Sequence, residues 1–199
     1  SSTSNFRNAT YLTYIKNALF VDYIDTTNAS INTETNEKIM WDMSTKQDNS
    51  VIAWLEDNET TDESGNKYYN LYIGAKNKIY AKSLKQFFQN MTSLETINFD
   101  NLDTGLTTNV GTAIYTGMFD NCQSLKEFDL SNWNTSNMIS LAGLFANCRS
   151  ITALDLSSFD TSNVTDMKYM FYNCTSLTSL NISNFDTRKV TNMGAMFVS

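Results

Sequence analysis

Two columns of short polar residues recur in the second half of the chain, and their types and spacing could support binding. The first column lies between apolar residues, as Asp155 lies between Leu154 and Leu156, and the second column lies two residues further on. Residues two apart on a strand point to the same side, so both columns should share one face, away from the core. Their carboxylate, amide and hydroxyl groups can hydrogen-bond to a partner. The candidate ligand-binding residues are Asn98, Asp129, Asp155 and Asn181 in the first column, and Asp100, Ser131, Ser157 and Ser183 in the second.

Two other interpretations of these columns stay open. Short polar side chains can simply solubilise a sheet face and hydrogen-bond along its ladder. A repeated Asp column can also hold Ca²⁺ through oxygen ligands. Only Asp129 and Asp155 of the first column are acidic, however, so we predict no metal site.

The composition excludes several kinds of chemistry. The chain has no His, which removes Ser-His-Asp and Cys-His catalysis and His-containing zinc sites. Its Asp and Glu residues are repeated in columns or clustered in loops, and it has no Gly-rich phosphate loop. We therefore expect no enzyme activity, no catalytic residues and no cofactor. The net charge of −7 argues against nucleic acid as a partner. No segment approaches the ~20 apolar residues of a membrane span, so we expect no membrane insertion.

The cysteines occupy one position of a repeat. Cys122, Cys148 and Cys174 are 26 residues apart, and Met91 stands at the same position of an earlier unit. A position that accepts Cys or Met is a buried apolar one. We therefore predict three free, buried thiols in place of a disulfide.

The repeat itself indicates the fold. Three consecutive 26-residue units match at more than half of their positions, and an earlier unit carries five extra residues between Asp103 and Tyr115. In each unit, apolar-polar-apolar alternation predicts a short strand. A second stretch places Val164, Met167 and Met170 on one helical face. The sequence therefore predicts an α/β solenoid of leucine-rich repeats, with one short strand and one short helix in each coil. The coils start at Phe88, Phe119, Phe145 and Phe171, and a truncated coil starts at Phe197.

We expect three parts along the chain. Residues 1–38 should form an N-terminal helix, within 5–20, followed by a polar linker. Residues 39–86 should form a cap that contains a β-hairpin of the runs 51–55 and 68–73. Together these parts would give the solenoid an N-terminal α+β cap. Residues 87–199 should form the leucine-rich-repeat array.

The repeats resemble a known family. The segment LDLSSFDTSNVTDMKYMFYNCTSLTSLNISNFDTRKVTNMGAMF (154–197) is similar to the BspA-type leucine-rich repeats of mycoplasmas and gut Firmicutes, and the resemblance covers residues 88–199. Members of that family are typically secreted or surface-displayed, and several act as adhesins or antigens. The resemblance therefore implies an extracellular protein of the bacterial cell surface, with secretion and anchoring signals outside this chain.

These observations lead to two functional hypotheses. In the first, the chain is an adhesin or binding module whose strand face or loops engage a host surface or matrix protein or a glycan. In the second, the array is a structural spacer that displays another domain and has no ligand of its own. The incomplete coil that starts at Phe197 could also allow end-to-end association of two copies.

Overall fold

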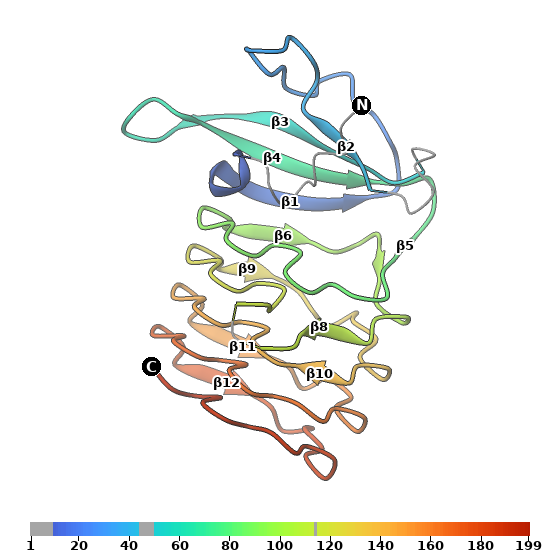
Figure 1. Ribbon diagram of the computed structural model, residues 1–199, viewed down its shortest axis with the longest axis vertical. Coiled ribbons are helices and arrows are strands. Elements are labelled where there is room, and N and C mark those ends of the chain that lie inside the picture. Colours follow the sequence, from blue (N-terminus) through green and yellow to red (C-terminus); the bar gives the residue numbers. More distant parts are fainter. Residues whose placement is uncertain (1–9, 44–49, 114) are drawn as a thin grey trace.

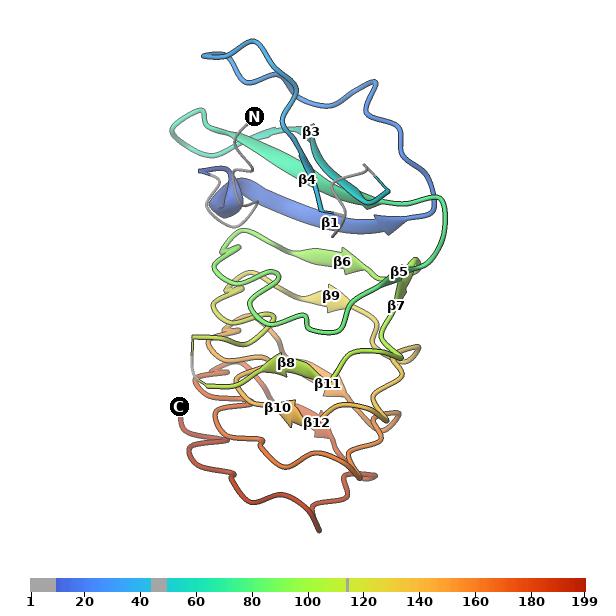
Figure 2. The ribbon, with the colours of Figure 1, turned by 45° about the vertical axis from the view of Figure 1, so that its right-hand side comes forward.

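The computed structural model describes residues 10–43, 50–113 and 115–199. Figures 1 and 2 show an elongated molecule in which turns of the chain lie one above another, from the N-terminal strands to the C-terminal residues. The only helix among the described residues is a short 3₁₀ turn, η2 (Leu12–Tyr14).

The largest sheet has six strands in the order β2-β3-β4-β1-β6-β9. β1 pairs in parallel with both β4 and β6, so an N-terminal strand lies between the hairpin and the first repeat strand. The strands β3 and β4 form an antiparallel hairpin over the region where the sequence predicts one. The bounds are β1 (Ile15–Val21), β2 (Met40–Asp42), β3 (Ile52–Thr61), β4 (Lys67–Gly74), β6 (Thr96–Asn98) and β9 (Glu127–Phe128).

The remaining strands form three small parallel sheets of two strands each. They join neighbouring turns of the chain on different sides of the stack (Figure 2). The pairs are β5 (Ile79–Tyr80) with β7 (Leu102–Asp103), β8 (Asn109–Gly111) with β10 (Ser140–Leu141), and β11 (Ala153–Asp155) with β12 (Ser179–Asn181).

The predicted α/β solenoid with a strand and a helix in each coil is wrong. The described residues contain no α-helix, and the strands are divided among one mixed sheet and three small ones. An α-helix needs each amide to bond four residues back. Here Gly143 N and Phe145 N instead donate to the carbonyls of Lys168 and Met170 in the next turn of the chain, each at 2.9 Å, while Ala146 N bonds to Gly143 O at 3.0 Å. Gly143 and Asn147 have φ of 66° and 60°, which bends the chain into tight turns.

The N-terminal helix expected within residues 5–20, the α part of the cap, is also wrong over its described part. Residues 15–21 form β1, in which Ile15, Ala18 and Phe20 are buried. Strand partners on both sides satisfy the β1 backbone, so tertiary pairing outweighs the helical spacing of its apolar residues. Residues 1–9 lie outside the described residues. The part boundaries at residues 38 and 86 stay predictions.

The core is a stack of aromatic and thiol side chains from successive units. The rings of Phe88, Phe119, Phe145 and Phe171 stack with centroids 5.5–5.9 Å apart. All three cysteines are free and buried, which confirms the thiol prediction. Each thiol donates to a carbonyl of the preceding unit at 3.0–3.1 Å, and burial raises the thiol pKa, for Cys174 to about 12.

Candidate functional site

One face of the six-stranded sheet carries a row of polar side chains across β3, β4, β1 and β6. Asn58 and Asn17 both donate from Nδ2 to Oδ1 of Asn70, at 2.7 and 2.8 Å. Thr96 donates from Oγ1 to Oδ1 of Asn17 at 2.7 Å. These bonds fix the orientation of each amide, so the row is a rigid polar strip.

A second row lies further along the same strands. Tyr72, Leu19 and Asn98 are register partners in β4, β1 and β6, and Asp129 directly follows β9. The ring of Tyr72 stacks on Trp54 with a centroid distance of 5.3 Å and an interplanar angle of 11°. Burial raises the pKa of the Tyr72 hydroxyl, and the protonated hydroxyl can donate a hydrogen bond. This row changes from aromatic to amide and carboxylate across the sheet.

Three adjoining hollows lie along these rows, with volumes of about 500, 430 and 370 Å³. Asn98 lines all three, Asp129 lines the first two, and Lys78 and Asp100 line the last two. Because the hollows share these walls, they form one concave region, which we call the Asn98 region. Small-molecule sites have volumes of roughly 300–1,000 Å³, so each hollow is large enough for a small ligand.

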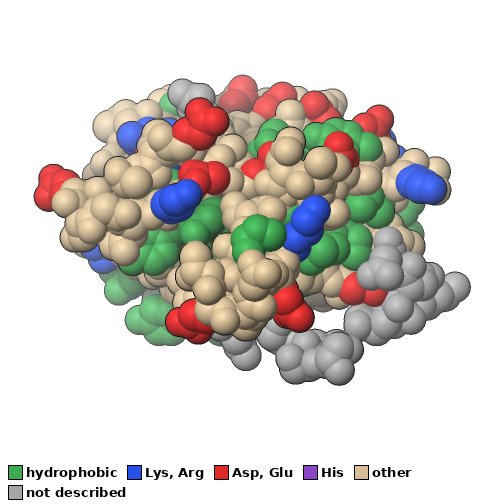
Figure 3. Space-filling model, turned by 90° about the horizontal axis from the view of Figure 1, so that it is seen from above, with side chains coloured by type: hydrophobic (Ala, Val, Ile, Leu, Met, Phe, Trp, Pro, Cys, Tyr) green, Lys and Arg blue, Asp and Glu red, His purple; other side chains and the backbone are tan. Residues whose placement is uncertain are grey.

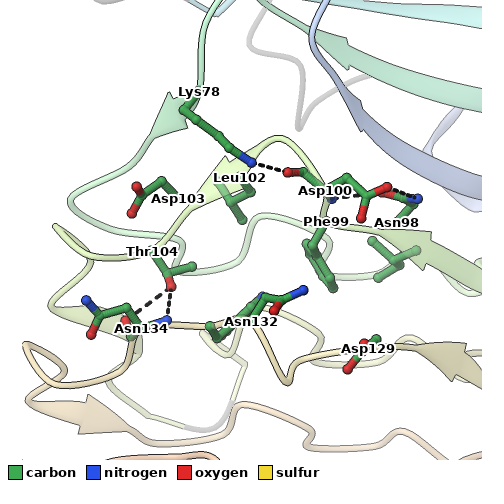
Figure 4. Close-up of a pocket in the computed structure, with 12 residues that line it drawn as sticks. Lys78, Asn98, Phe99, Asp100, Leu102, Asp103, Thr104, Asp129, Asn132 and Asn134 are labelled. Carbon is green, nitrogen blue, oxygen red and sulfur yellow. Dashed lines mark hydrogen bonds between the residues drawn. The ribbon is translucent and has the colours of Figure 1, made fainter.

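Figure 4 shows the hollow of about 430 Å³, which is lined by Lys78 and by residues of the segments 97–104 and 129–134. Asn98 Nδ2 donates to Asp100 Oδ2 at 2.9 Å, and Lys78 Nζ donates to the Asp100 carbonyl. On the opposite wall, Thr104 Oγ1 donates to the Asn134 carbonyl at 3.1 Å and accepts from Asn134 N at 2.8 Å. These contacts hold the polar wall in place without a ligand.

The two predicted columns have a structural use in every unit. The side chain in the first column accepts a hydrogen bond from the backbone N–H two residues on, at 2.8 Å for Asp129, 2.9 Å for Asp155 and 3.2 Å for Asn181. Asn98 does the same for Asp100 N at 2.8 Å. Such bonds stabilise the turn after each strand. The spacing of the columns is therefore explained without a ligand.

Hydrogen bonds from the second column lower two carboxyl pKa values. Ser131 donates from N and Oγ to Asp129, and Ser157 donates from its side chain and its N–H to Asp155, which lowers the pKa of both carboxyls. Asn181 Nδ2 also donates to Asp155 Oδ1 at 3.0 Å, a bond along the ladder.

The eight candidates divide into two groups. Asn98, Asp100 and Asp129 lie together in the Asn98 region. The other five lie at the ends of β11 and β12 and in the turns after β9, β11 and β12: Ser131, Asp155, Ser157, Asn181 and Ser183.

Sequence reasoning missed several residues of the region. Asn70 lies inside a predicted strand, but Asn17 lies in the stretch expected to be a helix, so the sequence pattern did not indicate a polar row that joins them. Tyr72 carries no signal either. Trp133 was not missed: the sequence places it in one column with Leu102, Phe159 and Phe185, which is read as core with an exposed aromatic strip for sugars as the alternative, and the structure buries it.

Charge is mixed around the N-terminal end of the molecule. Acidic side chains lie around the rim in Figure 3, with Lys and Arg scattered between them. Within the described ranges, no group of three or more His, Cys, Asp or Glu side chains could hold a metal ion. No helix in the described part of the chain is long and apolar enough to cross a membrane.

Comparison with known proteins assigns a family. No curated protein and no solved structure matches the chain. A family model described as "Mycoplasma protein of unknown function, DUF285" matches residues 82–199, which is more than half of the chain and includes every repeat unit. This family is related to the BspA-type proteins, which confirms the resemblance at that level, whereas no repeat family is assigned. The chain thus belongs to the DUF285 family of mycoplasma proteins.

Proposed function

We propose that this chain is a binding module of a bacterial surface protein and acts as an adhesin for a host protein or glycan. The observation that carries the proposal is the Asn98 region, where three adjoining hollows share one polar wall. Its amides and carboxylates are held by internal hydrogen bonds, so binding would cost little ordering of the protein. The similarity of its repeats to BspA-type proteins supports an extracellular location.

A spacer without a ligand is the second candidate. The polar columns support this candidate, because in three units the side chain of the first column stabilises the turn that follows it. That use explains Asp155 and Asn181 fully, but it does not explain the polar row of Asn17, Asn70 and Thr96 on the sheet. Because Asn17, Asn70 and Thr96 line the hollow of about 500 Å³, this row favours the binding module.

Asp129→Ala and Asp155→Ala form a matched pair that tests the proposal. Both variants lose a bond to the backbone N–H two residues on, at 2.8 and 2.9 Å, but only Asp129 lines two of the hollows. Binding of the purified chain to immobilised matrix proteins and mucin glycans would be measured by biolayer interferometry. We expect Asp129→Ala to weaken capture about tenfold, the effect of roughly one charged hydrogen bond, and Asp155→Ala to leave it unchanged. Equal losses in both variants, or no capture by the native chain, would contradict the binding module.

A further inference from the structure

Trp133 carries a buried hydrogen-bond donor without a partner. Its side chain is 5% exposed, and its Nε1 is the one buried side-chain N or O atom among the described residues that has no hydrogen bond. The indole lies between Phe99, at a centroid distance of 5.2 Å, and Phe159, at 6.2 Å. Buried polar groups in proteins nearly always have a partner, and an unpaired one weakens the fold. Since Phe stands at this position in the next two units, packing alone does not require the N–H.

The unpaired donor belongs to a side chain that lines the 430 Å³ hollow of Figure 4. Asn132, directly beside Trp133 in the chain, is exposed and lines the same hollow. Within the described part of the chain, its side-chain amide makes no hydrogen bond, so it can move at little cost to admit a ligand atom. The buried side chains Ile97, Phe99 and Leu102 give the hollow an apolar floor.

The charges of the hollow restrict the ligand. Asp100, Asp103 and Asp129 face a single cationic residue, Lys78, so an anionic ligand would be repelled. A simple cation cannot accept a hydrogen bond from an indole N–H. Neutral hydroxyl groups can accept from Trp133 and donate to the carboxylates at the same time. A pyranose ring combines such hydroxyls with an apolar C–H face that suits an aromatic floor.

We infer that the hollow binds one neutral saccharide unit, and that a ring hydroxyl accepts a hydrogen bond from Trp133 Nε1. The inference rests on the proposed function and gives its ligand class: a glycan whose recognised unit is uncharged. Trp133 is then a specificity residue, because it supplies the donor that the equivalent Phe159 lacks.

A glycan array provides the first test. The native chain would be applied to mannose-, galactose-, glucose- and N-acetylglucosamine-terminated oligosaccharides, each beside a sialylated or sulfated counterpart, with bacterial polysaccharides on the same array. We expect binding to a neutral terminus and loss of binding when it carries an anionic group. Because mammalian and bacterial glycans are on the same array, the bound spots show whether the recognised saccharide comes from the host or from bacteria.

Two changes at position 133 provide the second test, with the neutral oligosaccharide bound on the array as the probe in calorimetry. Trp133→Phe removes the N–H, and replacement of Trp133 by β-(3-benzothienyl)alanine removes it while the shape of the ring is kept. Both should bind about tenfold more weakly, the affinity of roughly one hydrogen bond. Phe159→Leu disturbs packing on the same indole but keeps the donor, so its affinity should stay within about twofold of the native value. The melting temperature of each variant reports folding independently.

The outcomes separate this inference from the proposed function. Neutral-glycan binding that both 133 variants weaken supports the inference. Unchanged affinity in the benzothienyl variant, or a preference for anionic glycans, overturns it. Capture of a matrix protein that depends on Asp129 but not on Trp133 would overturn the saccharide inference while the binding module stands. Absence of any capture would overturn both.

Discussion

At the scale of single residues, Asp120 is the group whose burial has the clearest consequence. It is fully buried and accepts from Asn147 Nδ2 and Gln89 Nε2, each at 2.9 Å. Asn147 in turn accepts from Asn173 at 2.9 Å, so the carboxylate ends a short ladder of amides between units. Burial raises the Asp120 pKa in spite of these two hydrogen bonds. The folded chain therefore holds a proton on Asp120 more tightly than the unfolded chain does.

We expect Asp120 to make stability fall as pH rises. A carboxyl whose pKa is raised on folding stabilises the protein below its unfolded pKa, and this contribution is lost as pH rises through the folded pKa. Asp120→Asn keeps the shape but cannot titrate. The free energy of unfolding of the native chain minus that of Asp120→Asn should therefore decrease between about pH 3 and pH 7, measured by urea denaturation. A difference that stays constant or grows with pH would contradict the burial argument. Asp155→Asn, at an exposed carboxyl whose pKa is lowered, should show the opposite trend.

At the scale of elements, the backbone conformation of the repeat turns explains why the chain forms stacked turns in place of helices. Left-handed residues interrupt the expected helical stretches, as Tyr169 and Asn173 do with φ of 57° each. Both amides donate to carbonyls of the following unit, at 3.0 and 2.6 Å. A backbone that bonds between units cannot also make the bonds of an α-helix. The apolar spacing of three and four residues arises here from consecutive tight turns.

Ala195 tests the turn conformation directly. Its φ is 52°, a region that Ala adopts at a cost and Gly adopts freely. We expect Ala195→Gly to raise the free energy of unfolding by about 0.5 kcal/mol, because relief of strain exceeds the entropy that Gly adds to the unfolded chain. In a helix the same change would lower stability by about 1 kcal/mol. Ala146→Gly, in the same kind of segment without a positive φ, should lower it. Thermal and urea unfolding of the two variants would show whether each change raises or lowers the free energy of unfolding.

The repeat period, the β-hairpin and the buried thiols could be predicted from the sequence, because each depends on local patterns. The turns could not, since i, i+3 and i, i+4 spacing fits a helix and a run of turns alike. Within the Asn98 region, Asn98, Asp100 and Asp129 could be predicted from their repeated alternation with apolar residues. Asn17, Asn70 and Lys78 could not, because only the sheet order and the chain turn after β4 bring them beside the repeats.

At the scale of the whole molecule, β1 joins the N-terminal hairpin and the first repeat strands into one sheet. Ala18 pairs with Leu71 of β4 on one side and with Ile97 of β6 on the other. A single hydrophobic cluster then runs from Ile15 to Met196. Loss of β1 would expose strand edges and core in both the hairpin and the first repeat, so we expect the chain to unfold as one cooperative unit.

Thiol labelling tests that cooperativity. Cys148 is buried and burial raises its pKa, so it should react with iodoacetamide only when the chain opens. Ala18→Asp places an unpaired charge at a position that is 1% exposed, which should cost about 3 kcal/mol or more and raise the labelling rate of the distant Cys148 at least ~100-fold. Lys16→Ala, on the same strand, removes a partly exposed contact of 3.5 Å to Glu95 and a cation–π contact with Tyr68, and should change the rate far less. If Cys148 stays protected in Ala18→Asp while the hairpin amides exchange, the repeats fold without the N-terminal strands, and the single-unit expectation is wrong.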